Sequence, residues 1–442
     1  MINNEFEKGL SKQVIERISS HKNEMDDMLN IRLKAYESFL EQKNPKWCND
    51  LNDIDFNEFI YYSDLLGKKS KSWDDIPQKI KDTFNKLGII EAEAKFLNGI
   101  STQLDSEVIY HKHKKELDDL GVIYCDTDTA YKQHHELFMK YFNKLVPYTD
   151  NKYAALNTSV WSGGTFIYVP PNTKIDKPLQ SYFRINSQSL GQFERTLIIV
   201  DKNSSLHYIE GCTAPIYSSN NLHAAVVEIY VEENSQMKYT TIQNWSDNVL
   251  NYVTKRAIVK DNATMTWIDG NIGSKHNIKF PSCVLAGENA CGNCISVAIA
   301  NQNVIQDTGA KMIHLNKNTK SNIISKSIGY KNSKSIFRGY VDIRKNADNS
   351  KAKIQCDTLL LDNELISETI PYEKNENNNS VIEHEASVSK ISDMQLNYLM
   401  SRGISEADAK HLIVLGFIDE FAKELPMEYA VELNRLIKLE IN

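Results

Sequence analysis

The sequence predicts a stacked β-solenoid with helical segments before and after it. Short β-rich runs such as GTFIYV, RTLIIV and AVVEIYV begin near residue 155. Small polar turns separate the runs, and asparagines recur in them at Asn172, Asn203, Asn234, Asn262, Asn289, Asn318 and Asn346. The spacings are 31, 31, 28, 27, 29 and 28 residues. A nearly fixed period with strand-type filling is typical of stacked repeats.

The residues after each turn support this prediction. The third residues after the asparagines include Leu206, Met237 and Met265, and the fifth include Tyr208, Tyr239 and Trp267. Positions two apart share one strand face, so stacked coils would build an apolar and aromatic ladder in the interior. The alternative is an antiparallel sandwich with evenly spaced hairpins. We favour the solenoid because sandwich strands seldom repeat one turn chemistry over seven cycles.

Residues 1–152 are predicted to be mostly helical. VIERISSHKNEMDDMLNIRLKAYESFLE carries apolar residues at roughly helical spacing. A second helix is predicted over residues 72–88, with Gly88 as its stop, and a third over 137–147, ended by Pro147. The β-solenoid core is assigned to residues 153–372.

Residues 373–442 form the C-terminal segment. The polar loop PYEKNENNNS precedes LNYLMSRGISEADAKHLIVLGFIDEFAKEL and EYAVELNRLIKLEI, which are amphipathic and predict helices. Ser405 is the expected N-cap of one helix, with Asp408 in its first turn.

Composition excludes several classes of protein. The net charge of −7 argues against a nucleic-acid-binding protein, which normally carries a basic patch. The N-terminal MINNEFEKGLSKQ has no hydrophobic signal region, and no apolar run approaches the ~20 residues that span a bilayer. Seven scattered cysteines indicate a reducing compartment. P-loop, G-x-S-x-G and H-E-x-x-H motifs are absent.

CGNC, from Cys291 to Cys294, is the first candidate for metal or redox chemistry. Zinc and iron–sulfur sites normally need four ligands, and the sequence has no second C-x-x-C. Cys294 lies five residues after Asn289, on the inward ladder, and Cys291 is expected in the turn. We therefore predict a structural role for this pair, and likewise for Cys48 and Cys125.

Cys212 is a second candidate, in a loop between Gly211 and Pro215. Cys212 lies nine residues after Asn203, and Gln243 lies nine residues after Asn234, so the two should stack in adjacent coils. Trp245 follows Gln243 at the next position on the same strand face. Arg184 precedes Cys212 by 28 residues, and a nearby arginine would favour the nucleophilic thiolate. Counted from Asn346, Cys356 is ten residues on, in the last recognisable coil, where a core role and a functional role both stay open.

Glu383, His384 and Glu385, in SVIEHEASVSKIS, are either metal ligands or a charged strand edge. On a strand His384 would face one side and both glutamates the other. All three could not bind one ion from a regular strand.

Many long motifs resemble one family over nearly the whole chain. They include SGGTFIYVPPN, PLQSYFRIN, GQFERTLIIVD, YIEGCTAPIYSSNNLHAAVVEI, YTTIQNWS, WIDGNIGSK, QDTGAKMIHL and ELPMEYAVELNRLI. These motifs resemble the SufB branch of the SufB/SufD family, the scaffold subunits of the SUF iron–sulfur cluster assembly system. The resemblance implies a right-handed parallel β-helix core between helical regions, and a scaffold rather than an enzyme.

The resemblance also implies partners and cargo. A SufC-type ABC ATPase would dock on the C-terminal helices, and a SufD-type paralogue or a second SufB would complete the complex. A cysteine desulfurase with a SufE- or SufU-type carrier would supply sulfur, and apoproteins would receive the cluster. The cofactors would be iron and a transient 4Fe-4S or 2Fe-2S cluster, with reduced flavin an open question. The compartment would be the bacterial cytoplasm or, for an organelle-encoded product, the plastid stroma.

Site residues carry over from the resemblance position by position. Cys212 matches the sulfur-accepting cysteine, and Cys356 matches the cysteine where the cluster is built. The residues that match the sulfur-transfer route are Arg184, Asn186, Gln243 and Trp245. The residues that match an acidic–histidine–acidic iron group are Glu383, His384 and Glu385. A SufD-like structural subunit without cluster chemistry is the first alternative, and a β-helix carbohydrate lyase or hydrolase is the second.

Overall fold

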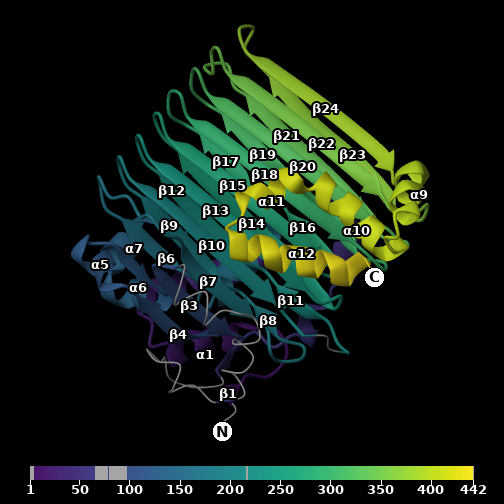
Figure 1. Ribbon diagram of the computed structural model, residues 1–442. Helices are drawn as coiled ribbons and strands as arrows, with labels where there is room; N and C mark the ends of the chain where they lie inside the picture. Colours follow the sequence, from purple (N-terminus) through teal and green to yellow (C-terminus); the bar gives the residue numbers. More distant parts are fainter. Residues whose placement is uncertain (1–3, 65–77, 79–96, 216–217, 442) are drawn as a thin grey trace. The chain divides into compact units, whose positions relative to one another are not determined.

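The computed structural model describes residues 4–64, 78, 97–215 and 218–441. It is a β-solenoid of about eight turns with helices at both ends, and strands make up 42% and helices 24% (Figure 1). The predicted fold class is thereby confirmed. Apart from Gln78, the helix predicted at 72–88 lies outside the described residues.

The chain divides into two compact units. The first comprises Met1–Leu206, Thr213–Glu232 and Asn248–Ile258, and the second comprises His207–Cys212, Glu233–Asp247 and Val259–Asn442.

The first unit contains the N-terminal helices and the first coils. Its helices are α1 (Lys12–His21), α2 (Asp26–Glu41), α5 (Lys115–Asp119), α6 (Thr127–Gln133), α7 (His135–Tyr141) and α8 (Lys152–Val160), with short 3₁₀ turns at Asn49–Asp53 and Phe56–Glu58. Its strands are β1 (Asn4–Glu5), β2 (Ser63–Asp64), β3 (Gly99–Leu104), β4 (Glu107–His113), β5 (Ile123–Cys125), β6 (Phe166–Val169), β7 (Leu179–Arg184), β8 (Gly191–Gln192), β9 (Arg195–Val200), β11 (Asn221–His223), β12 (Val226–Val231) and most of β14 (Val249–Val259).

The helix predicted over 137–147 ends early, at Tyr141. Asn143 has a left-handed backbone (φ 59°), which stops the helix. The carboxylate of Glu228 accepts hydrogen bonds from the backbone N–H groups of Asn143, Leu145 and Val146. The same carboxylate forms a fully buried ion pair with Arg195 at 2.6 Å, so this turn is fixed by a charge held inside the fold.

The second unit contains the later coils and the C-terminal helices. Its strands are β10 (Ser205–Thr213, largely in this unit), β13 (Gln236–Trp245), β15 (Thr264–Gly273), β16 (His276–Lys279), β17 (Ser282–Leu285), β18 (Cys291–Ala300), β19 (Ile305–His314), β20 (Lys320–Gly329), β21 (Lys334–Ile343), β22 (Lys351–Leu360), β23 (Ile366–Asn375) and β24 (Val381–Lys390). Its helices are α9 (Asp393–Ser401), α10 (Glu406–Phe417), α11 (Asp419–Glu424) and α12 (Met427–Ile441). Strands therefore continue past the predicted core boundary at residue 372.

Strands of this unit pair in parallel, coil upon coil. One sheet runs β24-β22-β20-β18-β15-β13, and the other runs β23-β21-β19 with β16 and β17 beside β19. The predicted ladder is confirmed: Tyr239 pairs in register with Trp267, and Trp267 with Cys294. Ring centroids of Tyr208 and Tyr239 lie 5.0 Å apart, and those of Tyr239 and Trp267 lie 5.2 Å apart.

The repeated asparagines adopt the left-handed conformation that the turns require. In this unit Asn234, Asn262, Asn289 and Asn318 all have φ between 55° and 59°. Asparagine tolerates this region better than other non-glycine residues. The seventh turn differs from the prediction, because Asn349 (φ 54°) rather than Asn346 holds the left-handed position.

The shift matters for Cys356. Counted from Asn349, Cys356 is the seventh residue, as Ser325 is the seventh after Asn318, and these two residues pair in register. The polar turn RKNADNS simply carries its left-handed asparagine three residues later.

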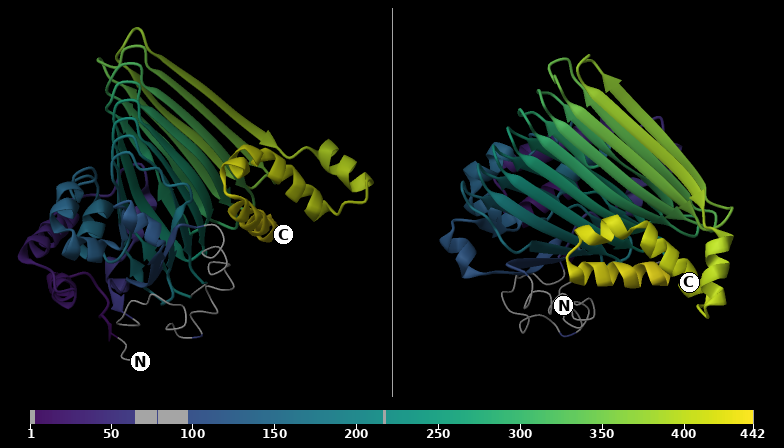
Figure 2. Two further views of the ribbon diagram at one scale, coloured as in Figure 1. Left: turned by 60° about the vertical axis from the view of Figure 1, so that its left-hand side comes forward. Right: turned by 45° about the horizontal axis from the view of Figure 1, so that its top comes forward.

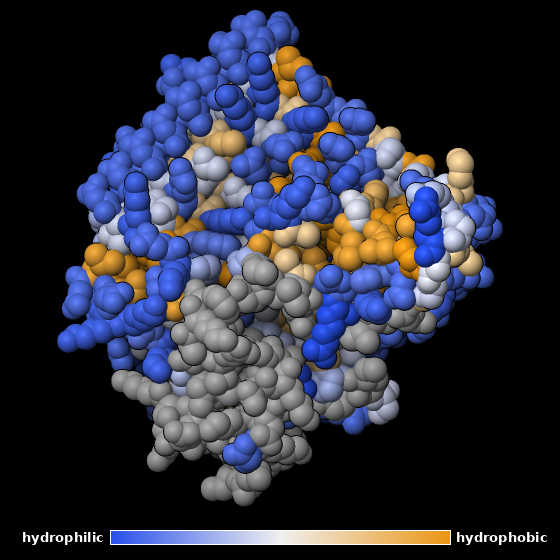
Figure 3. Space-filling view, in the orientation of Figure 1, coloured by the Kyte–Doolittle hydropathy of each residue, from blue (hydrophilic) through white to orange (hydrophobic). Residues whose placement is uncertain are grey.

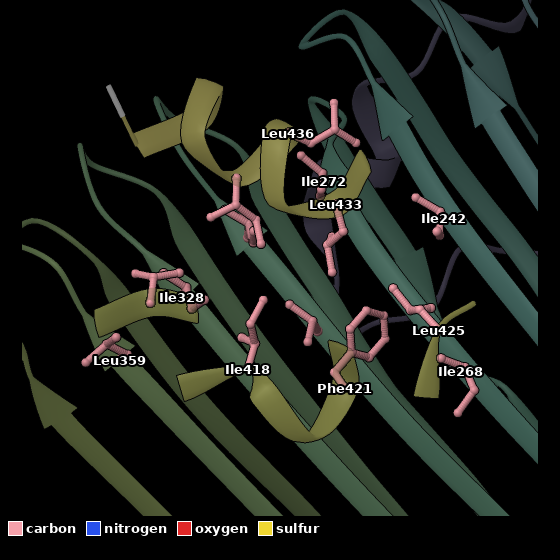
Figure 4. Packing of buried hydrophobic residues seen from close by; sticks show 14 residues of the cluster. Ile242, Ile268, Ile272, Ile328, Leu359, Ile418, Phe421, Leu425, Leu433 and Leu436 are labelled. Carbon is pink, nitrogen blue, oxygen red and sulfur yellow. The ribbon is translucent and has the colours of Figure 1, made fainter. Parts of the chain in front are cut away.

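The C-terminal helices α10–α12 pack on the outer face of the strands in this unit (Figures 1 and 2). Phe421 of α11 is fully buried in a cluster with Ile268, Ile299 and Leu433 (Figure 4). Gly270 leaves space for that ring, since a Cβ there would come 3.2 Å from the Phe421 Cζ atom. No helix in the described part of the chain is long and apolar enough to cross a membrane.

Lowering the pH is expected to destabilise the fold through His314. Its buried ring contacts the hydroxyls of Thr319 (2.8 Å) and Ser321 (2.9 Å), and burial lowers its pKa to about 4. The unfolded chain would take up this proton near pH 6.5, so the histidine lowers stability as pH falls from 6.5 to 4, by about 3 kcal/mol in total. Free energies of unfolding between pH 7 and 4.5 should fall less steeply in His314→Gln. The partly exposed His411→Gln is the control, and equal slopes for wild type and His314→Gln would contradict the expectation.

Candidate functional site

The last coils of the solenoid bring a thiol and an imidazole together. Cys356 lies on β22, where inward, buried residues alternate with outward ones such as Lys351 and Lys353, and its side chain is buried. Its Sγ lies 3.8 Å from Nε2 of His384 on β24 and 3.8 Å from Oγ1 of Thr369 on β23. Strands β23 and β24 are each the last strand of their sheet (Figure 1). Cys356 and His384 therefore lie at the end of the coil stack.

Glu373 contacts the other ring nitrogen of His384. Its Oε1 lies 2.6 Å from Nδ1 of His384, and both side chains are partly exposed. Glu373 was not predicted, because the sequence assigned PYEKNENNNS to a polar loop, whereas β23 continues through Glu373 to Asn375. The turn at 376–380 is short, so residues near the end of β23 lie close to those near the start of β24.

Glu383 and Glu385 do not join the group. In register they pair with Lys353 and Gln355, on the outward face of the sheet, and both are exposed. The structure thus brings His384 to Cys356 and directs the two neighbouring glutamates away, as strand alternation requires.

Burial raises the pKa of the Cys356 thiol, and the nearby Asp357 carboxylate adds to this rise, while the Thr369 hydroxyl opposes it. The free thiol is therefore protonated at neutral pH. A metal ion that binds the sulfur as thiolate would release this proton.

The spacing of the pair suits one metal ion. Metal–sulfur and metal–nitrogen bonds of about 2.3 and about 2.0 Å at a tetrahedral angle place the two ligand atoms about 3.5 Å apart. The observed 3.8 Å needs only a small adjustment. Within the described residues, no three or more His, Cys, Asp or Glu side chains form a group that could hold a metal. Two ligands leave positions open for sulfide or another chain.

Cys212 lies on strand β10 rather than in a loop as predicted, because β10 continues through Gly211 to Thr213, and its side chain is buried. Its Sγ is 3.9 Å from Oε1 of Glu210, which shares its strand face, and the other carboxylate oxygen of Glu210 accepts a hydrogen bond from the Tyr239 hydroxyl. Burial, followed by the charge of Glu210, raises the pKa of Tyr239 well above its ordinary value, so the hydroxyl stays a donor. Glu210 was not predicted.

Gln243 and Trp245 are buried on β13. The Gln243 Oε1 atom accepts a hydrogen bond of 2.8 Å from Lys279, whose ammonium also lies 3.1 Å from the Asp269 carboxylate. Lys279 is fully buried, which is unusual for lysine, and its ammonium is satisfied by the Asp269 carboxylate and the Gln243 side chain inside these coils. Lys279 was not predicted as a buried residue, because a lysine near a strand end normally indicates a solvated face.

Arg184 and Asn186 belong to the first unit. Arg184 is the last residue of β7, and its carbonyl accepts a hydrogen bond from the Asp105 N–H (2.9 Å). The backbone N–H of Asn186 donates to the Asp105 carboxylate at 2.6 Å.

None of the cysteines in the described part of the chain forms a disulfide bond. Cys294 is fully buried on the ladder, as predicted. Cys291 is the first residue of β18 rather than a turn residue, because the strand begins directly after Ala290. Cys283 on β17, which the sequence analysis did not single out, is fully buried, and this burial raises its pKa to about 12.

Fold and site together define a β-solenoid protein with a buried thiol and an imidazole 3.8 Å apart in the last coils of its stack. Two family models match the chain: the SufBD core domain of SUF system FeS cluster assembly over residues 183–417, and the SufBD protein N-terminal region over residues 10–181. The chain belongs to this SufB/SufD family of iron–sulfur cluster assembly proteins.

Its relatives carry matching descriptions. The chain is 54% identical to the iron-sulfur cluster assembly protein SufB of Bacillus subtilis (strain 168). The 435 aligned residues cover 98% of this chain and 94% of the relative. Iron-sulfur cluster assembly SufBD family proteins of Staphylococcus saprophyticus and Staphylococcus aureus (strain MRSA252) match with the same identity and coverage.

Proposed function

We propose that this protein is the scaffold on which iron and sulfide are joined into a cluster before delivery to apoproteins. The observation that carries the proposal is the pairing of Cys356 with His384. Thiolate and imidazole both bind iron, and a site with few protein ligands can release its cargo. Iron and the cluster are cargo here, not resident cofactors.

Cys212 is the proposed entry point for sulfur. Cys212 loses its proton, and its thiolate attacks the terminal sulfur of a donor persulfide. A new S–S bond forms on Cys212 as the S–S bond of the donor breaks, and the released donor thiolate takes up the proton. The donor is a cysteine desulfurase acting through a SufE- or SufU-type carrier. Buried polar groups of the same unit, Gln243 and Lys279 among them, support a route for sulfur through the interior. Arg184, Asn186 and Trp245 are the further residues that we propose for sulfur transfer.

Two surfaces support the proposed partners. Met394, Tyr398 and Met400 on α9 and Leu412 on α10 are exposed, and Figure 3 shows apolar side chains gathered over α10 and α12. This surface suits a SufC-type ATPase, since patches of apolar side chains mark interaction sites.

The ends of the sheets at β23 and β24, which expose Ile366, Tyr372 and Val388, suit a SufD-type paralogue or a second copy. We place the complex in the bacterial cytoplasm.

The test is anaerobic co-expression with SufC- and SufD-type partners, followed by analysis of iron, acid-labile sulfide and visible absorption. We expect a complex that contains stoichiometric iron and sulfide and shows thiolate-to-iron charge-transfer bands. A complex that assembles but never holds a cluster under sulfur and iron supply would overturn the scaffold proposal. It would favour a SufD-like structural subunit.

A further inference from the structure

We infer that Glu373 is the positioning residue that makes Nε2 of His384 the metal-binding nitrogen beside Cys356. The inference rests on the proposed iron site and adds a residue that neither the sequence motif nor the family assignment identifies. The expected ligand is a divalent transition ion that accepts one thiolate and one imidazole, as ferrous iron does.

The hydrogen-bond geometry carries the argument. A carboxylate only accepts hydrogen bonds, so the contact of 2.6 Å between Glu373 Oε1 and His384 Nδ1 requires a proton on Nδ1. In the neutral ring, Nε2 then carries the lone pair. This nitrogen faces the Cys356 sulfur at 3.8 Å, so the lone pair is directed to the position that a shared metal would occupy.

The location of Glu373 suits this role. It is held by pairing with Val341 along β23, so its backbone position is determined by the sheet rather than by a loose loop. Its side chain is 33% exposed, which means that the core does not depend on it. Glu383 and Glu385 point to the opposite face and cannot replace it. Metal-bound histidines commonly donate their second N–H to such a carboxylate.

Cobalt(II) titration of the full chain under anaerobic conditions tests the inference, because thiolate-bound cobalt has a charge-transfer band that requires no turnover. Glu373→Ala should weaken cobalt binding by about 10- to 100-fold, the usual effect of losing such an outer-shell partner. Glu373→Gln keeps an oxygen acceptor and should lose less. Glu376→Gln, which removes an exposed carboxylate near the same strand, is the matched control and should bind like wild type.

A second readout separates positioning from a general structural effect. Nitrogen NMR of ¹⁵N-histidine-labelled protein, with His384→Gln to assign the signal, should show an Nδ1-protonated ring in wild type. In Glu373→Ala the proton should move to Nε2. Unchanged cobalt affinity and an unchanged tautomer in Glu373→Ala would overturn the inference alone. Two other results would instead overturn the proposed metal site: a cobalt band that persists in Cys356→Ser, or a wild-type protein that never forms the band.

Discussion

Replacing Cys356 by serine is expected to remove the iron–sulfur cargo from the purified complex and to leave the solenoid folded. A serine hydroxyl remains protonated at neutral pH and is a poor ligand for iron in a cluster, whereas a cysteine gives a thiolate. The two side chains have nearly the same size, so the buried position is not left empty. Iron and acid-labile sulfide per complex should fall to the background of a cluster-free preparation.

Two further variants sharpen this test. Cys291→Ser changes a half-buried thiol elsewhere in the same unit and should keep its cargo. His384→Ala keeps the thiol and should retain some sulfide but bind iron less firmly. Full cargo in both Cys356→Ser and His384→Ala would show that the cluster is built elsewhere, and residues 383–385 would then be an ordinary strand edge.

Phe421→Ala is expected to release the C-terminal helices from the sheet. The Phe421 ring is fully buried and packs against Gly270. Truncating a buried phenylalanine to alanine typically lowers the free energy of unfolding by about 3–5 kcal/mol, and the loss is larger where the cavity cannot collapse. Denaturant unfolding should show an early transition, and co-purification with the SufC-type ATPase should weaken because its proposed docking surface is no longer held together.

Leu412→Ala is the matched control for stability. Leu412 is exposed on α10, so its truncation should change the free energy of unfolding little. Weaker ATPase binding in Leu412→Ala at unchanged stability would support direct contact at this surface. Stability of Phe421→Ala equal to wild type would contradict the packing argument.

Local chemistry was enough to predict the coil stack. Asparagine at the left-handed position and an inward ladder of Met, Tyr and Trp are properties of each repeat, so the period, the register of Tyr239 on Trp267 and the burial of Cys294 follow from the sequence. The same alternation predicted that His384 and its neighbouring glutamates face opposite sides.

The repeat could not predict which asparagine closes the seventh turn, since Asn346 and Asn349 both fit its chemistry. The backbone adopted there decides between them, and it is Asn349 that is left-handed.

By itself, then, the sequence determined the solenoid, its inward face and the candidate cysteines, because strand alternation and turn preference act over a few neighbouring residues. Only the tertiary structure decided that Cys356 contacts His384 diagonally across two strands, that Glu373 reaches the same ring, and that Lys279 lies buried beside Gln243. These contacts depend on strand register and side-chain rotamers in successive coils. Such long-range geometry arises only when the coils are stacked.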